Sequence, residues 1–279
     1  MNTKGLRRRV ARRFAALPRQ LFRLDRRNIG IILHSLGKIT SDTLLVHSSL
    51  SACGSVKGGP LSVVGALRDW IGLDKNLVMP THSYCYPNAD GEVEIFDPSA
   101  TPSRVGAITD CFWREPSVVR SLHPTHSLAV VGPAKAELCV GHEHCDTPCG
   151  RGTPYERLIQ WDAAALMFGA TMNTYTLFHT AEDAGQAPYL YMAEPVDLRA
   201  RCADGSIIRV RMRRQDMSVP RRFDEMATWL EEREMLIRHR LGMGELLFIP
   251  SSARVHALIK EQMDKDPYFL VSQKFTGKP

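Results

Sequence analysis

Short apolar runs alternate along the chain with longer segments in which apolar residues recur every three or four positions. The runs at 43–46, 76–80 and 165–168 have the length and composition of buried strands, and a polar bend at 121–127 leads into another at 128–131. The segment 61–70 repeats apolar residues at helical spacing. This alternation predicts an α/β fold.

The second half of the chain adds a hairpin and further helices. The alternating segments 196–201 and 207–212 flank an Asp-Gly pair, which is a strong hairpin signal. The segment 223–241 reads as an amphipathic helix with many i, i+4 charge pairs, closed by Gly242 and Gly244. Other predicted elements are helices at 104–114, 134–140 and from Pro154, then a strand at 246–249, a helix at 253–263 and an edge segment at 267–270.

The stretch 163–186 is the most informative, because a buried strand is followed by a tight loop and a helix that carries chemistry. His179, Glu182 and Asp183 lie within one helical turn. Residues three apart share a helical face, so a carboxylate beside the imidazole can fix its tautomer for general-base chemistry. The alternative is an N-capped helix whose histidine is an ordinary satisfied polar residue.

Polar clusters follow two of the predicted strands. His47, Ser48 and Ser49 come directly after the first strand, and Thr81 follows the second. The carboxyl ends of parallel strands are where ligands bind in open α/β sheets. A Gly/Ser-rich loop then runs from 51 to 59 into a helix, an arrangement that can hold a phosphate, but it matches neither the Walker nor the dinucleotide spacing.

Composition describes an ordinary globular chain of 279 residues, with 44% hydrophobic and 24% charged residues. No apolar run approaches the ~20 residues that a membrane span needs, so no integral membrane segment is expected. The seven cysteines are odd in number and no secretory apolar region follows the first arginines, which together favour free thiols and a cytoplasmic location.

The positive charge is concentrated at the start of the chain. Residues 1–27 carry a net charge of +9, which leaves −3 for residues 28–279 out of a total of +6. We therefore divide the chain into an Arg-rich arm or helix at 1–27 and an α/β domain at 28–279. Leu17, Leu21 and Leu24 recur at helical spacing, which favours a short helix docked on the body or on another subunit. The acidic body gives no reason to expect a nucleic-acid partner.

One segment, 139–149, invites a metal hypothesis. His142, His144, Cys145 and Cys149 are ligand types that zinc prefers. A metal-dependent hydrolase built on this cluster is the alternative function. Against it, structural zinc sites use paired ligands far apart in sequence, whereas these residues form one run. A third reading is a non-enzymatic adaptor that binds nucleic acid or an anionic membrane through the basic arm.

Five motifs in order resemble the aminoglycoside 3-N-acetyltransferase family: VHSSLSACGSVKGG, LVMPTHS, FDPSATPSRVGAI, RSLHPTHSLAVVG and NTYTLFHTAED. The resemblance covers about residues 40–190. It implies a single domain with a central mixed sheet flanked by helices, and acetyl transfer from acetyl-CoA to a primary amine, with no metal. The acceptor it implies is a small-molecule amine, either an aminoglycoside or an amino sugar, and a homodimer is compatible with it.

The resemblance also implies roles for individual residues. His179 would be the general base and Glu182 the acid that orients it, while Thr81 is our choice for the donor to the thioester oxygen. Asp97, Asp183 and Tyr84 would contact the acceptor. The cofactor would lie against His47, Ser48, Ser49, Leu50, Ser55, Val56, Ser121, Leu122 and His123. An ammonium must lose a proton before it attacks a thioester, and a histidine with a pKa near ~6.5 suits that task.

Overall fold

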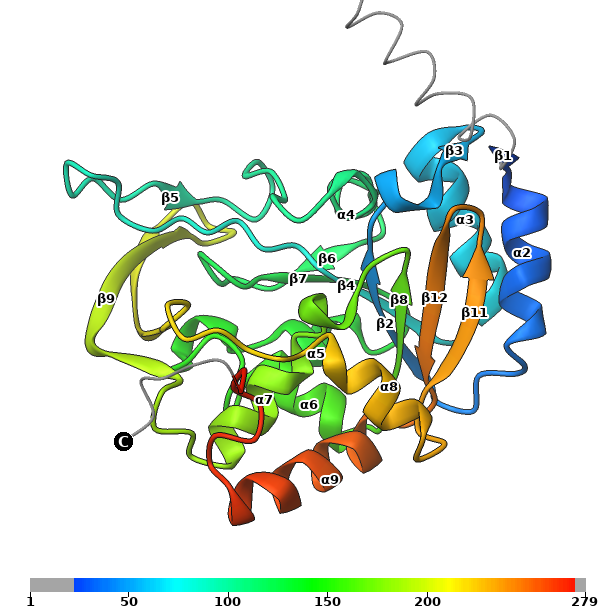
Figure 1. Ribbon diagram of the computed structural model, residues 1–279. Helices are drawn as coiled ribbons and strands as arrows, with labels where there is room; N and C mark the ends of the chain where they lie inside the picture. The colour runs from blue at the N-terminus through cyan, green and yellow to red at the C-terminus, as the bar shows by residue number, and fades with distance from the viewer. Residues whose placement is uncertain (1–22, 274–279) are drawn as a thin grey trace, which may run out of the picture.

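The computed structural model describes residues 23–273, which form an α/β structure around a seven-stranded mixed sheet (Figure 1). The strand order is β11-β12-β8-β2-β4-β7-β6. The strands are β2 (Thr43–Ser48), β4 (Asn76–Pro80), β6 (Val119–Arg120), β7 (Leu128–Val131), β8 (Ala164–Phe168), β11 (Ile237–Leu241) and β12 (Gly244–Ile249). The central strands β8, β2 and β4 are parallel, and their neighbours on both sides run antiparallel. The mixed sheet implied by the resemblance is therefore confirmed.

Helices cover both faces of this sheet. They are α2 (Arg26–Ser35), α3 (Gly59–Ile71), α4 (Ala107–Phe112), α5 (Lys135–Cys139), α6 (Pro154–Gln160), α7 (Leu177–Ala184), α8 (Glu225–Glu231) and α9 (Ser252–Lys265). Short 3₁₀ turns occur at η1 (Ser51–Cys53), η2 (His142–His144) and η3 (Met172–Thr174). Helices α2, α3 and α4 pack on one face, and α5 to α9 lie on the other (Figure 1).

The central strands are apolar on both sides because each face is covered. In β2, Leu44 and Val46 contribute to the core beneath α2, α3 and α4, whereas Leu45 contributes to the core beneath α6, α7 and α9. In β8, Leu166 and Met167 divide between the same two cores. Successive side chains of a strand point to opposite faces, so two covered faces require a continuous apolar run. This is the physical reason that the short runs predicted strands.

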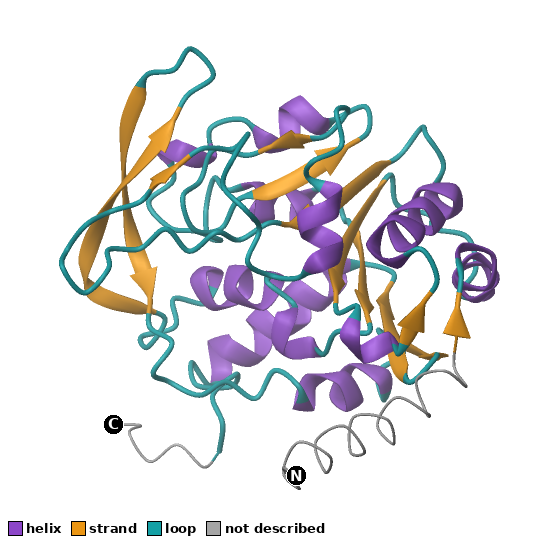
Figure 2. Cartoon of the chain, turned by 90° about the horizontal axis from the view of Figure 1, so that it is seen from above, coloured by secondary structure: helices purple, strands orange, loops and turns teal. Residues whose placement is uncertain are grey.

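A second, three-stranded sheet stands at one side of the molecule, away from α2 (Figure 2). It contains β5 (Ile95–Phe96), β9 (Tyr191–Arg201) and β10 (Ile207–Gln215), and a two-stranded pair joins β1 (Arg23–Leu24) to β3 (Ser55–Val56). The register pairs Ile207 with Arg201 and continues through Met212 with Val196. The predicted hairpin is confirmed, and it extends further along the chain at both ends.

The prediction of one long helix over 223–241 was wrong. Helix α8 ends at Glu231, and β11 and β12 form an antiparallel hairpin at the edge of the main sheet. Arg238 pairs with Glu231 at 3.1 Å and with Glu245 at 2.6 Å across the hairpin, so charges that suggest a helix stabilise a strand. Gly242 has φ +57°, and a Cβ there would lie 2.4 Å from the Cys53 carbonyl oxygen, so it serves the hairpin turn rather than a helix end.

Three smaller expectations need adjustment. The helix expected over 104–114 is confined to α4, and the edge segment at 267–270 is a turn beside an isolated bridge between Arg221 and Val271. Leu24 lies in β1, paired with Val56, and not in a helix. The rest of the predicted arm helix, with Leu17 and Leu21, lies outside the described residues.

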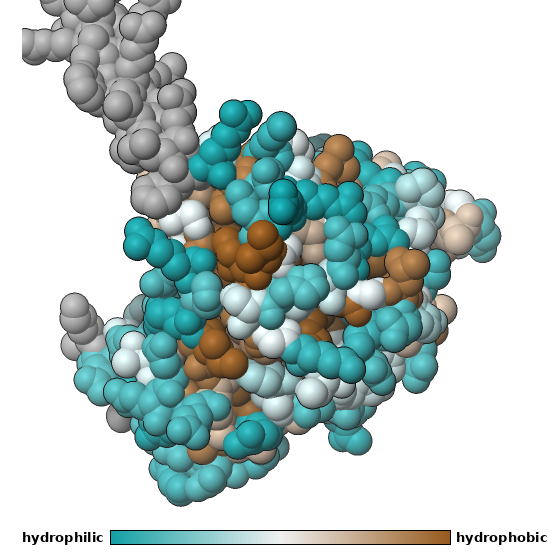
Figure 3. Space-filling view, turned by 90° about the vertical axis from the view of Figure 1, so that its right-hand side faces the viewer, coloured by the Kyte–Doolittle hydropathy of each residue, from teal (hydrophilic) through white to brown (hydrophobic). Residues whose placement is uncertain are grey.

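The face formed by α2 and β11 shows hydrophobic groups separated by polar side chains (Figure 3). Ile31 of α2 and Ile237 of β11 are among the exposed large apolar residues. Within residues 23–273, no helix combines the length and the apolar character that crossing a bilayer requires.

Candidate active site

The site is built at the junction of β8 and α7. Strand β8 ends at Phe168, and Gly169 turns the chain with φ +68°, at a position where a Cβ would come within 2.7 Å of the Ser49 carbonyl oxygen. Helix α7 then buries Phe178 and Ala181 against the core. His179 lies on the opposite side of the helix, with 12% of its side chain exposed toward a cavity.

His179 is held by a buried carboxylate. Its Nδ1 lies 2.6 Å from Glu182 Oε2, and the Glu182 side chain is fully buried. The second oxygen, Oε1, accepts a hydrogen bond from Arg221 Nε at 3.2 Å. A carboxylate accepts and does not donate when ionised, so Nδ1 of His179 is the donor in this contact, and Nε2 is the ring nitrogen that Glu182 does not engage.

Arg221 itself is locked in place. Its guanidinium also donates to the backbone carbonyls of Asp216 and Val219 and is almost fully buried. Burial alone would raise the pKa of the Glu182 carboxyl, but the hydrogen bonds and charges of His179 and Arg221 hold that pKa below its ordinary value. Glu182 is therefore an anion at neutral pH, available to stabilise a protonated His179.

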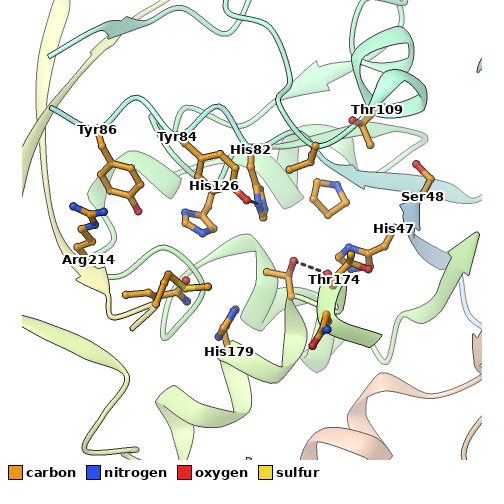
Figure 4. Close-up of a pocket in the computed structure, with 16 residues that line it drawn as sticks. His47, Ser48, His82, Tyr84, Tyr86, Thr109, His126, Thr174, His179 and Arg214 are labelled. Carbon is orange, nitrogen blue, oxygen red and sulfur yellow. Dashed lines mark hydrogen bonds between the residues drawn. The ribbon is translucent and has the colours of Figure 1, made fainter. Parts of the chain in front are cut away.

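The cavity beside His179 has a volume of about 380 Å³. It is lined from the ends of β2 and β4, from η3 and α7, and from the end of β10. Its lining residues are His47, Ser48, Pro80, His82, Tyr84, Tyr86, Val105, Thr109, His126, Asn173, Thr174, Thr176, His179, Arg214, Gln215 and Met217. In Figure 4, Tyr86 and Arg214 lie at one end and Ser48 and Thr109 at the other, with His179 along the floor between them. The size and shape of this cavity suit a small-molecule ligand.

Three further histidines line this cavity without a carboxylate partner. His82 hydrogen-bonds to Tyr155 through Nε2 at 2.9 Å and to Tyr84 through Nδ1 at 3.1 Å, and its ring lies 4.5 Å from that of His126. Burial lowers the pKa values of His47 and His126 to about 3, and lowers that of His82 well below its ordinary value. These side chains are neutral hydrogen-bonding groups.

Of the residues singled out from the sequence, four line the cavity: His47, Ser48, Tyr84 and His179. Glu182 lies directly behind His179. Ser48 Oγ and His47 Nε2 are buried with no hydrogen-bond partner in the described part of the protein. These two atoms are therefore available to a ligand.

Thr81 is not among the residues that line the cavity, so its placement does not support the expected role as donor to the thioester oxygen. Its side chain is fully buried, and its hydroxyl lies 3.1 Å from Ser127 Oγ and accepts from Arg120 Nε at 3.0 Å. The strand direction explains this placement: Pro80 and His82 line the cavity, and Thr81 between them points the other way.

The three residues of the Arg-Ser-Leu-His-Pro motif are also displaced from the cavity. Ser121 bonds to His142 Nδ1 at 2.9 Å, and the fully buried ring of His123 stacks on that of His142 at 4.3 Å. Leu122 packs against the core of the second sheet. This segment supports the cavity wall from behind instead of lining it.

The remaining expected residues are not among those that line the cavity. Asp97 accepts from Ser99 and pairs with Arg201 at 3.4 Å, and neither Asp97 nor Asp183 is among the residues that line the cavity. Asp183 accepts from Tyr191 at 2.6 Å. The other cofactor residues proposed from the sequence follow β2, through η1 and β3; they are Ser49, Leu50, Ser55 and Val56.

The metal cluster expected as an alternative does not form. Within residues 23–273, no group of three or more His, Cys, Asp or Glu side chains is arranged to hold a metal ion. His142 is buried between Ser121 and the Pro148 carbonyl, whereas the His144 side chain is 79% exposed. Burial raises the pKa of the Cys149 thiol well above its ordinary value, which disfavours the thiolate that zinc requires. The metal-dependent hydrolase hypothesis therefore has no set of metal ligands among the described residues.

Several site residues escaped the sequence reading. His82 follows the strand at 76–80 and His126 lies in the polar bend at 121–127, so the sequence carries a local signal for both. Arg214 and Arg221 carry no local signal, because only long-range folding brings them to the cavity and to Glu182, and Tyr86 follows Tyr84 by two residues in the loop after β4.

The family model for aminoglycoside 3-N-acetyltransferase matches residues 45–262. Aminoglycoside N(3)-acetyltransferase IV from Salmonella sp is 31% identical over 241 residues, which cover 86% of this chain and 87% of that protein. Aminoglycoside N(3)-acetyltransferase VIII from Streptomyces fradiae is 33% identical over 191 residues, 61% of this chain and 65% of that protein.

A solved structure of the aminoglycoside acetyltransferase AAC(3)-IVa apoenzyme matches 91% of this chain and 94% of its own, with a TM-score of 0.75 and 28% identity. The chain therefore belongs to the aminoglycoside 3-N-acetyltransferase family, which confirms the family and the enzyme class expected from the sequence.

Proposed function

We propose that this chain transfers an acetyl group from acetyl-CoA to a primary amine of an amino sugar or aminoglycoside-like acceptor, with His179 as general base. The observation that carries the proposal is the buried Arg221–Glu182–His179 series opening onto a cavity. A histidine with an unprotonated Nε2 facing a ligand space, backed by an anion, is what proton removal requires.

The reaction proceeds by direct transfer. Nε2 of His179 takes a proton from the ammonium, and the amine attacks the thioester carbonyl carbon. The nitrogen of the tetrahedral intermediate releases its second proton to solvent, and the intermediate then collapses with cleavage of the carbon–sulfur bond. CoA leaves as a thiol after receiving the proton of the imidazolium, so the products are the amide, the CoA thiol and one free proton. Glu182 stabilises the imidazolium between these steps. With Thr81 turned away, Ser48 is the hydroxyl that we propose as donor to the thioester oxygen.

The cofactor is proposed to occupy the end of the cavity near Ser48 and to extend along the turn that follows β2. A solved neighbour with a TM-score of 0.76 is AAC-IIIb in binary complex with CoASH, and a histidine-to-alanine mutant of AAC(3)-IVa is solved in complex with a gentamicin. Both neighbours support a site for CoA and an amine on this fold.

The direct test is acetyl transfer to a panel of aminoglycosides and amino sugars, with acetyl-CoA binding measured by calorimetry. We expect acetyl-CoA to bind in the micromolar to millimolar range and CoA thiol to be released only when an amine is present. Absence of binding at millimolar acetyl-CoA would contradict the proposal.

Two further expectations remain proposals. The exposed apolar residues on the face of α2 and β11 are compatible with a homodimer, which sedimentation would reveal as a doubled mass. A cytoplasmic location is proposed from the cysteine usage, and fractionation of cells that produce the protein would test it.

A further inference from the structure

We propose that the acceptor carries a negative charge close to its reactive amine, and that Arg214 binds this charge. The inference rests on the proposed acetyl transfer and adds the substrate class. Its basis is the charge of the cavity wall: among the lining residues are four histidines, two tyrosines and one arginine, but no aspartate or glutamate. A wall with a guanidinium and no carboxylate does not fit a polycation.

The three carboxylates that the sequence analysis assigned to the site are already engaged. Glu182 is fully buried behind His179 and forms an ion pair with Arg221. Asp97 pairs with Arg201, and Asp183 accepts from Tyr191 and from the backbone of residue 151. The acidic residues expected from the sequence to hold a cationic acceptor are therefore committed to the protein itself.

Arg214, in contrast, carries a positive charge that can bind a ligand. It lies near the end of β10, is solvent-exposed, and stacks over the Tyr86 ring at 4.5 Å. Within residues 23–273 it forms no ion pair. Asp216, two residues further on, is hydrogen-bonded to Ser218 at 2.6 Å, although the charge of Arg214 contributes to lowering the pKa of this carboxyl. The stack fixes the guanidinium plane and leaves its donors for an oxyanion.

The position of Arg214 favours a contact with the acceptor over a contact with the cofactor. Figure 4 places Arg214 and Tyr86 at the end of the cavity opposite Ser48 and Thr109, with His179 between the two ends. An amino sugar lying between His179 and Arg214 presents its amine to the base and an anionic substituent to the guanidinium. His126 also lines the cavity, and because only its Nδ1 is bonded to Thr125, the Nε2 atom of its neutral ring can bind a hydroxyl group of the sugar.

A matched set of amino sugars isolates the charge. Glucosamine, glucosamine 6-phosphate and 2-amino-2-deoxyglucuronic acid share one ring and one amine, and they differ in carrying no anion, a phosphate or a carboxylate. Gentamicin supplies the polycation. We expect kcat/KM to be about tenfold higher for at least one anionic sugar than for glucosamine, since a charge-assisted pair to arginine is worth about that factor, and lowest for gentamicin. The two anionic sugars show whether a phosphate or a carboxylate is preferred.

Variants of Arg214 test whether this residue causes the preference for an anionic acceptor. Arg214→Gln is expected to reduce the preference for the anionic sugar to within about twofold, through the KM of the acceptor, with the KM of acetyl-CoA unchanged. Arg214→Glu is expected to favour gentamicin over the anionic sugars. Arg213→Gln is the matched control, because Arg213 is on the same strand but stacks on Tyr191 outside the cavity lining; it should keep the wild-type preference.

The outcomes separate this inference from the function on which it rests. Preference of the wild-type protein for gentamicin, an unchanged preference in Arg214→Gln, or an increased KM for acetyl-CoA in that variant would each overturn the role of Arg214. A protein that binds acetyl-CoA but acetylates neither anionic sugar would also overturn it and leave the cofactor site standing. Failure to bind acetyl-CoA would instead contradict the proposed acetyl transfer.

Discussion

Two kinds of histidine share one cavity, and the difference between them lies in what stands behind each ring. His179 has a buried carboxylate at 2.6 Å, itself paired with Arg221. His82 has the hydroxyls of Tyr84 and Tyr155, and His126 has that of Thr125. A hydroxyl can satisfy a neutral imidazole but brings no charge to stabilise an imidazolium. In the proposed mechanism, the buried anion, and not a place in the cavity wall alone, is what distinguishes His179 as the base.

The largest expected effect comes from removing the base. His179→Ala should lower kcat by roughly 10²- to 10⁴-fold, the usual contribution of general-base catalysis, while the affinity for acetyl-CoA stays nearly constant. Steady-state kinetics and calorimetry measure the two quantities. A variant that kept most of its activity would show that His179 is not the base.

The next largest effect is expected from removing the charge of Glu182, the carboxylate that contacts His179. Glu182→Gln keeps the size of the side chain but loses its charge, and its amide can present a donor to Nδ1, so we expect kcat to fall by roughly 10- to 100-fold. The thermal unfolding midpoint must be measured in parallel, because Glu182 also pairs with Arg221. Near-normal kcat in a folded variant would contradict the comparison.

In the proposed mechanism Arg221 positions Glu182, and the effect of replacing it should depend on pH. Arg221→Met removes an interaction that lowers the pKa of Glu182, so the carboxyl will protonate at a higher pH and activity will fall earlier as the pH is lowered. We expect about a tenfold loss near pH 6 and a smaller one near pH 8. Arg221→Lys should restore part of the activity and move the acidic limb back. A uniform loss at all pH values would indicate a purely structural role.

The smallest effect on catalysis is expected at the neutral histidines. His126→Gln retains hydrogen-bonding capacity and should change kcat less than about fivefold, with any larger change appearing in the KM of the acceptor. Loss of kcat equal to that of His179→Ala would erase the distinction between the two kinds of histidine.

The buried neutral histidines also predict a pH dependence of stability. Burial lowers the pKa of His142 to about 3, whereas an unfolded histidine titrates near ~6.5. The unfolded chain therefore binds protons first, and the free energy of unfolding should fall below about pH 6.5, by up to about 1.4 kcal/mol per pH unit for each such residue.

Denaturant unfolding between pH 7 and pH 5 measures this slope. His142→Gln should flatten it, although the variant is less stable at pH 7, and His144→Gln, at an exposed neighbouring position, should leave it unchanged. Equal slopes in the wild type and His142→Gln would contradict the assignment of a neutral buried ring.

The elements that the sequence predicted correctly are those whose causes are local. The run 165–168, the turn at Gly169 and the three-residue spacing of His179 and Glu182 together determine β8, its loop and the hydrogen bond between these two side chains. The features that the sequence did not predict depend on contacts between residues that are far apart in the chain or on different elements. Arg221 is 39 residues from Glu182, and the partners of Arg238 include Glu245 on a neighbouring strand. The placement of Thr81 has a simpler cause: side chains alternate along an extended chain, so Thr81 points away from the cavity that Pro80 and His82 line.

The proton position on His179 tests the central claim most directly. Nitrogen-15 NMR of the histidine side chains at pH 8, with His179→Ala used to assign the signals, distinguishes a protonated from an unprotonated ring nitrogen. We predict that Nδ1 of His179 carries the proton, hydrogen-bonded to Glu182, and that Nε2 is unprotonated. A proton on Nε2, with Nδ1 bare, would leave no base facing the cavity and would contradict the mechanism.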